Sequence, residues 1–210
     1  MRKRVGILIS GRGSNMAALV RAAAQPGYPA EIAIVISHKA DAPGLQVARE
    51  MGIEAVAIAA RMPEFEVEAD RLLHERGVEI VCLAGFMRLL STGFVERWRD
   101  RLLNVHPSLL PAFPGLDAQA QALAAGVKIA GCTVHLVRPE MDTGPILMQA
   151  AVPVLPDDSV DTLSIRIIRR EHEIYPAALA RLARGEVRID GEIAHLADVA
   201  RDDRMIVPNP

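Results

Sequence analysis

The chain has 210 residues and a formal net charge of −2; half of its residues are hydrophobic and only 3% are aromatic. This length suits one domain with a sizeable core, and the composition excludes a disordered chain. The near-neutral charge provides no positive field for a nucleic-acid partner. We therefore expect a packed α/β protein without a nucleic-acid partner.

The two cysteines, Cys82 and Cys132, lie far apart in apolar runs and lack Cys-x-x-Cys spacing. This usage indicates buried thiols in a reducing compartment, not disulfides or a zinc site. The first four residues, MRKR, resemble the start of a signal peptide, but the apolar run Val5–Ile9 behind them is too short for one. No apolar run reaches membrane-spanning length. We expect a cytoplasmic protein with no membrane partner.

The first half of the chain alternates short apolar runs with helical segments. The expected strands are Val5–Ile9, Glu31–Ser37, Glu54–Ile58, Glu79–Leu83 and Leu102–His106. The expected helices are Asn15–Ala24, Gly44–Met51, Glu64–Glu75 and Thr92–Trp98. Short continuous apolar runs indicate strands that are covered on both faces. Their alternation with helices predicts an α/β protein with a mostly parallel, doubly wound sheet.

The pattern changes after Pro114. The expected elements there are a helix over Ala118–Ala124, strands over Ala130–Val137 and Ile146–Val154, a long amphipathic helix over Val160–Arg184, and a hairpin around Asp190-Gly191. We expect these later strands to be antiparallel.

Two glycines, Gly11 and Gly13, separate the first expected strand from the first expected helix. Backbone amides at a helix start bind anions, and glycines let the chain approach a phosphate closely. The dinucleotide fingerprint is incomplete, because Met16 stands where its third glycine belongs, and the Lys-Ser/Thr of a P-loop is missing. The segment is either an anion site or a tight turn with Ser14 as a helix N-cap.

Asn104 and His106 end the fifth expected strand and point to the same side of it. Ligands of parallel sheets bind beyond the carboxyl ends of strands. An amide can donate to a developing oxyanion and an imidazole can move a proton near neutral pH, so the pair suits acyl transfer. Pro107, Pro111 and Pro114 restrict the loop that follows. The alternative is that both side chains only cap backbone groups at a strand end.

Asp142 lies in an Asp-Thr-Gly-Pro turn between two expected strands. A carboxylate there could orient His106 and favour its charged form, although aspartate is also common in ordinary β-turns. We interpret four other histidines as surface or strand residues: His38, His74, His135 and His195. None of them has the spacing of metal ligands. We expect no metal.

Six segments, taken together, carry a resemblance. They are LISGRGSN, LAGFMRLLS, LLNVHPSLLPAFPG, GCTVHLV, MDTGPILMQ and REHEIYP. In this order they resemble the phosphoribosylglycinamide formyltransferases, folate-dependent enzymes of purine synthesis, over nearly the whole chain. The resemblance implies one Rossmann-like domain of formyltransferase type over residues 1–210. Residues of about 1–106 would form its phosphate-binding half, and residues of about 107–210 its folate-binding and catalytic half.

The resemblance implies an enzyme that transfers the formyl group of 10-formyltetrahydrofolate to the amine of 5-phosphoribosylglycinamide, without a metal, as a monomer or homodimer. The residues that match the family's catalytic triplet are Asn104, His106 and Asp142. Those that match its phosphoribosylglycinamide site are Arg12, Gly13, Ser14, Asn15 and Glu171, with Arg169 and Arg170 close enough to meet the phosphate. Those that match its folate pocket, besides Asn104, are Met87, Arg88, Leu89, Leu90, Arg138, Glu140 and Met141.

Two positions depart from the family pattern. The His-x-His that often follows the Pro-Gly of the loop is here Asp117-Ala118-Gln119. A folate-binding arginine expected near Glu66 is missing, with Arg61 as a candidate substitute.

Other functions remain open at this point. A methionyl-tRNA formyltransferase or a formyltetrahydrofolate hydrolase would share the triplet, but each would need an additional domain for which we expect no room. An NADP-dependent oxidoreductase could use the glycine loop with Ser37-His38-Lys39. A phosphoribosyl-binding module without enzymatic activity is a third alternative, but it would assign no function to Asn104, His106 and Asp142.

Overall fold

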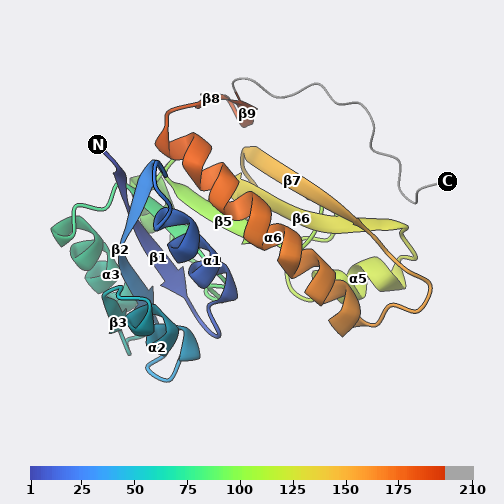
Figure 1. The fold of residues 1–210 in the computed structure, drawn as a ribbon, viewed down its shortest axis with the longest axis horizontal. Coiled ribbons are helices and arrows are strands. Elements are labelled where there is room, and N and C mark those ends of the chain that lie inside the picture. Colours follow the sequence, from blue (N-terminus) through green and yellow to red (C-terminus); the bar gives the residue numbers. More distant parts are fainter. Residues whose placement is uncertain (197–210) are drawn as a thin grey trace.

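The computed structural model describes residues 1–196, and its elements follow the expected alternation (Figure 1). The strands are β1 (Lys3–Ile9), β2 (Ala30–Ser37), β3 (Ala55–Ala57), β4 (Ile80–Leu83), β5 (Leu102–His106), β6 (Ile129–Leu136), β7 (Ile146–Pro153), β8 (Val187–Asp190) and β9 (Ile193–Leu196). The helices are α1 (Ser14–Ala23), α2 (Pro43–Glu50), α3 (Glu64–Glu75), α4 (Thr92–Arg97), α5 (Ala118–Ala124) and α6 (Val160–Ala183).

Seven strands form one sheet in the order β3-β2-β1-β4-β5-β6-β7. The five strands from β3 to β5 are parallel, and β6 and β7 continue the sheet in antiparallel pairing. The last two strands form a separate antiparallel hairpin. This confirms the predicted fold class, a mostly parallel doubly wound sheet followed by antiparallel strands and a long helix.

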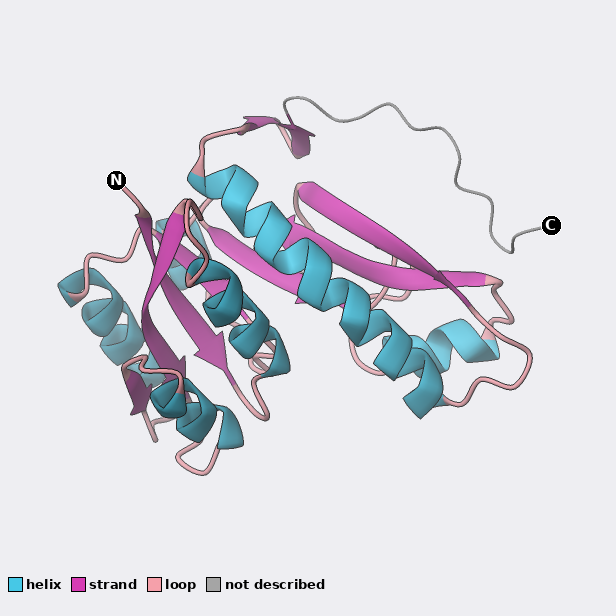
Figure 2. Ribbon diagram, viewed as in Figure 1, coloured by secondary structure: helices cyan, strands magenta, loops and turns pink. Residues whose placement is uncertain are grey.

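Helices cover both faces of the sheet, as Figure 2 shows. Side chains of α1, α2 and α6 bury one face, around Leu19, Leu45 and Tyr175. Side chains of α3 and α4 bury the other face, around Phe65 and Trp98. Because both faces are covered, the central strands carry apolar residues continuously, which is why their sequences lack an alternating pattern.

One local expectation and one open alternative were wrong. The third strand covers only Ala55–Ala57, because it is an edge strand that pairs only with the last three residues of β2. Ser14 is not the N-cap of the first helix: the cap is Gly13, in a left-handed conformation with φ 77°, and no side chain caps the helix.

Both cysteines are buried and free, and burial raises the pKa of each thiol to about 12. They are therefore inert core residues at neutral pH, as expected. Among the helices of residues 1–196, none combines the length and the apolar character that crossing a membrane requires.

Candidate active site

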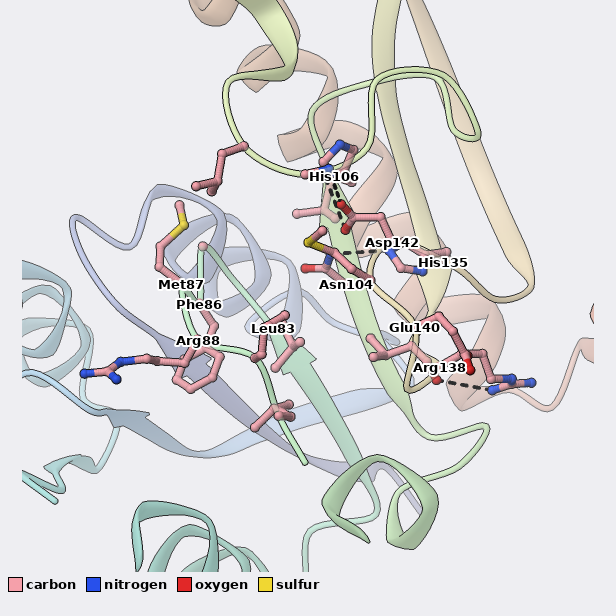
Figure 3. A pocket seen from close by; sticks show the side chains of 18 of the residues that line it. Leu83, Phe86, Met87, Arg88, Asn104, His106, His135, Arg138, Glu140 and Asp142 are labelled. Carbon is pink, nitrogen blue, oxygen red and sulfur yellow. Dashed lines mark hydrogen bonds and ion pairs between the residues drawn. The ribbon is translucent and has the colours of Figure 1, made fainter. Parts of the chain in front are cut away.

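A cavity of about 590 Å³ opens beyond the carboxyl ends of β4 and β5, within the range of roughly 300–1,000 Å³ that small-molecule sites occupy. Its walls come from the segment after β4, the end of β5, the loop before α5 and the turn between β6 and β7. Figure 3 shows Phe86 and Met87 on one side, across from Asn104, His106 and Asp142.

Asn104 and His106 both line this cavity, so the predicted common orientation is confirmed. His106 is 5% exposed. Its Nε2 lies 3.0 Å from the carbonyl oxygen of Phe113, and its Nδ1 lies 3.4 Å from Asp142 Oδ1. Each ring nitrogen of His106 therefore faces an oxygen atom.

Asp142 joins two parts of the cavity. Its Oδ2 accepts a hydrogen bond of 2.7 Å from the backbone N–H of Gly115, while its Oδ1 faces His106. Asp142 itself has a positive φ of 53°, in the left-handed region that aspartate tolerates better than most residues. The structure therefore brings together the three residues of the predicted triplet, from β5 and from the β6–β7 turn.

His135 is a site residue that the sequence interpretation missed. It lies opposite Asn104 in the antiparallel pairing of β5 and β6, is 2% exposed, and lines the cavity. Its Nε2 is 3.3 Å from Asn104 Nδ2 and its Nδ1 is 3.1 Å from the carbonyl oxygen of Thr143. Burial lowers its pKa, which favours a neutral ring. His135 could be identified as a site residue only from the register of β5 and β6, and no local sequence motif indicates this register.

The cavity wall that matches the folate pocket is largely apolar. Met87, Leu89 and Met141 line it with exposed fractions of 69%, 76% and 57%. Exposed apolar side chains gathered around one cavity indicate a surface for a partly apolar ligand. Leu90, Glu140 and Arg88 also line the cavity, and the Arg88 side chain extends away from the triplet (Figure 3).

Arg138 lines the cavity, but its guanidinium is engaged elsewhere. It forms ion pairs of 2.8 Å with both Asp100 and Glu192, and its side chain is 5% exposed. Glu192, at the tip of the β8–β9 hairpin, also pairs with Arg99 at 3.2 Å. The side chain of Arg138 therefore braces the turn that carries Asp142 and is not free to bind a ligand's charge.

The glycine loop lies at the same edge of the sheet as the cavity, at the end of β1. The N–H of Gly44, at the start of α2, donates to the Gly11 carbonyl at 3.0 Å. Arg12 and Ser14 are exposed, and Arg12 forms no ion pair with any residue of 1–196. The loop thus has a braced backbone and a free cation beside it, which suits an anion.

Asn15 and Glu171 meet although 156 positions separate them along the chain. Asn15 Nδ2 donates to Glu171 Oε2 at 2.7 Å, and burial raises the pKa of Glu171 although this hydrogen bond opposes the rise. Asn15 Oδ1 is buried and has no hydrogen-bond partner among residues 1–196. The residues predicted to bind the phosphoribosyl substrate therefore come from α1, the loop before it and α6.

The remaining predicted residues lie as follows. Asp117 and Gln119 line the cavity in place of the family's His-x-His. Glu66 is buried and accepts hydrogen bonds from the backbone N–H and hydroxyl of Ser91. Arg61 is not among the residues that line the cavity, so the structure does not support it as a substitute for the missing arginine.

Arg169 and Arg170 are exposed on α6, and Arg170 pairs with Glu173 at 2.7 Å. In the described part of the chain, no group of three or more His, Cys, Asp or Glu side chains is arranged to hold a metal ion.

Comparisons with known proteins show similarity over most of this chain. The family described as formyl transferase matches residues 3–179. Phosphoribosylglycinamide formyltransferase of Escherichia coli K12 is 42% identical over 92% of this chain and 92% of its own length. The chain belongs to the phosphoribosylglycinamide formyltransferase family.

Two further comparisons place the chain within this family. A crystal structure of glycinamide ribonucleotide transformylase 1 from Symbiobacterium toebii has a TM-score of 0.90 and 46% identity over 94% of this chain and 95% of that one. A trifunctional purine biosynthetic protein of Drosophila melanogaster is 49% identical over 92% of this chain, which spans only 15% of that protein's length. Relatives of this chain therefore include chains of similar length and much longer ones.

Proposed function

We propose that this protein transfers the formyl group of 10-formyltetrahydrofolate to the primary amine of 5-phosphoribosylglycinamide. The observation that carries the proposal is the juxtaposition of Asn104, His106 and Asp142 at one end of an apolar-walled cavity. Family membership at 42% identity over nearly the full length of a bacterial relative supports the same assignment.

The chemistry needs charge stabilisation and proton movement. The amine attacks the formyl carbon, a C–N bond forms, and negative charge develops on the formyl oxygen. Asn104 Nδ2 carries two N–H groups, of which one faces His135, and the other has no hydrogen-bond partner among residues 1–196 and can donate to that oxygen. His106 in its protonated form stabilises the same charge and then protonates the folate nitrogen as its bond to the formyl carbon breaks. Asp142 holds the imidazolium and relays the proton that the amine loses.

The acceptor would lie on the glycine-loop side. We assign its phosphate to the backbone of the loop from Arg12 to Asn15, and its ribose and glycinamide to Glu171. The donor would lie along Met87 to Leu90 and the turn from Arg138 to Asp142. In this arrangement each substrate takes residues from both halves of the chain, because Met87 to Leu90 precede residue 107 and Glu171 follows it.

The test is an assay of tetrahydrofolate release from 10-formyltetrahydrofolate with and without phosphoribosylglycinamide. We expect release only when both are present. Release without the acceptor would indicate a hydrolase and overturn the proposal. Failure to release tetrahydrofolate under either condition would also overturn it and leave a binding module or an oxidoreductase; binding of NADP would identify the latter.

A further inference from the structure

Ser10 connects the two sides of the proposed active site. It follows β1, precedes Gly11 and is 4% exposed. Its Oγ accepts a hydrogen bond of 2.6 Å from the backbone N–H of Met87. Because Met87 belongs to the cavity wall after β4, this one residue joins the backbone of the glycine loop to the wall that faces the donor.

A second group orients the Ser10 hydroxyl. His38 Nδ1, just beyond β2, lies 3.3 Å from Ser10 Oγ. Since the Ser10 oxygen already accepts from Met87, its own proton is available for Nδ1, which places the ring proton of His38 on Nε2. Burial, with the nearby charges of Arg88 and Lys39, lowers the pKa of His38 and is consistent with a neutral ring that accepts.

The same histidine supports the wall through packing. Its ring meets the rings of Phe86 and Phe65 edge-on, with centroids 5.4 and 6.2 Å away, and these two phenylalanines stack at 5.5 Å. Phe86 lines the cavity, whereas Ser10 and His38 lie behind the wall and are not among its lining residues. Ser10 and His38 therefore act on the cavity through the position of its wall and not by lining it.

We propose that Ser10 is a positioning residue that holds the donor-facing wall at Met87 in a fixed relation to the phosphate-binding loop. The inference rests on the proposed function, in which the formyl carbon must be presented to an amine whose phosphate the loop holds. Displacement of either partner by about 1 Å can cost two orders of magnitude in rate.

Loss of the Ser10 hydroxyl should displace the cavity wall at Met87 more than the glycine loop. The loop has further supports, the Gly44–Gly11 hydrogen bond and the first turn of α1. Met87 and Leu89 are exposed, and loss of the Ser10 hydroxyl leaves the Met87 N–H without its partner. Removing this hydroxyl should therefore affect the donor more than the acceptor.

The experiment compares Ser10→Ala with a matched control, Ser37→Ala. Ser37 is also buried, also ends a strand of the same sheet edge, and its Oγ also accepts from a backbone N–H, that of Lys39 at 3.0 Å. We expect Ser10→Ala to raise the KM for 10-formyltetrahydrofolate by about fivefold or more, since the Met87 N–H loses the hydrogen-bond partner that fixes its position. The KM for the acceptor should stay within about twofold, and Ser37→Ala should change neither KM while it lowers the melting temperature similarly.

Equal effects of the two variants on the donor KM, or a donor KM unchanged in Ser10→Ala, would overturn the inference. His38→Phe provides a second measurement, because it retains a ring against Phe86 but removes Nδ1. It should also raise the donor KM, by a smaller factor than Ser10→Ala. An unchanged donor KM would show that His38 does not help to position Ser10. Absence of formyl transfer by the parent protein is a different result, which refutes the proposed function before any variant is compared.

Discussion

At the scale of single residues, the site depends on hydrogen-bonding groups whose partners are already fixed. Asn104 uses one N–H toward His135, and His106 is held between Phe113 and Asp142. Such positioning limits the rearrangement that must accompany the reaction, which is how preorganised sites stabilise developing charge.

Substitution of either polar group on β5 should lower turnover without unfolding the protein. We expect His106→Ala to reduce kcat by roughly 10²–10⁴-fold, the usual contribution of a positioned acid or base. Asn104→Ala should cost on the order of 10²–10³-fold, because it removes an oxyanion donor. Steady-state kinetics with circular dichroism as the folding control provide the measurement. Losses below about tenfold in both variants would exclude these roles.

The charge of Glu171 should lower the stability of the folded protein while it contributes to binding of the acceptor. Its folded-state pKa lies above the ordinary value of 4.5, so its stabilising contribution is present at low pH and is lost as pH rises through the folded pKa. Glu171→Gln keeps an acceptor for Asn15 but carries no charge. Urea unfolding should show the variant gaining stability over the parent at pH 8 and losing that advantage toward pH 4.5. An advantage that grows as the pH falls would contradict the assignment, and we expect a raised acceptor KM in the same variant.

The sequence indicated part of this site because some of its residues are neighbours along the chain. Asn104 and His106 share a strand end, and the glycines mark a loop. His135 and the Asn15–Glu171 pair could not be found in this way, because strand register and helix docking bring them together across 31 and 156 positions. The ion pair between Arg138 and Glu192 could not be predicted for the same reason, since the two residues are 54 positions apart.

At the scale of elements, the glycine loop combines a structural and a ligand-facing role, and the two can be separated. A Cβ at Gly13 would lie 3.0 Å from Gly44 Cα, and its φ is +77°, whereas a Cβ at Gly11 meets nothing within 4 Å. We expect Gly13→Ala to cost about 1–2 kcal/mol in the free energy of unfolding. Gly11→Ala should stay within about 0.5 kcal/mol of the parent. Denaturant titrations of both variants check this, and equal stabilities would mean that the loop is more adaptable than its contacts indicate.

Arg12 offers the cleaner test of phosphate binding, because it is exposed and its removal breaks no ion pair within residues 1–196. We expect Arg12→Ala to raise the acceptor KM by roughly 10–100-fold, as for a lost charged hydrogen bond, with the donor KM and the melting temperature unchanged. Arg188→Ala, at a side chain that is 69% exposed in the β8–β9 hairpin, is the control. Similar acceptor KM values in both variants would remove Arg12 from the phosphate site.

The β8–β9 hairpin braces the turn that carries Asp142, through Glu192 and Arg138. Glu192→Gln should raise the donor KM by about two- to fivefold, since an exposed carboxylate contributes roughly 0.2–1 kcal/mol to an ion pair. Asp190→Asn is the matched control, because Asp190 pairs only loosely with Arg188 in the same hairpin, at 3.6 Å. The double variant Glu192→Gln, Asp100→Asn should have the larger effect. A donor KM that stays at the parent value even in the double variant would show that the turn holds its position without the hairpin.

At the scale of the whole molecule, the alternation of strands and helices was readable from the sequence, because strands covered on both faces are continuously apolar. The strand order was not, since β1 lies between β2 and β4 and this arrangement depends on crossovers rather than local patterns. The order matters for function: it places the ends of β1, β4 and β5 side by side, which brings the glycine loop, the cavity wall and Asn104 to one edge of the sheet.

The central claim is that the formyl group passes directly from the folate to the acceptor amine. Its most direct test uses 10-formyltetrahydrofolate labelled with ¹³C in the formyl group, incubated with phosphoribosylglycinamide and a slight excess of the protein, with the products followed by NMR. The account predicts that the label appears in the formamide of the acceptor in one-to-one ratio with released tetrahydrofolate, and that free formate does not accumulate. Label recovered as formate, or label that stays on the folate, would contradict it.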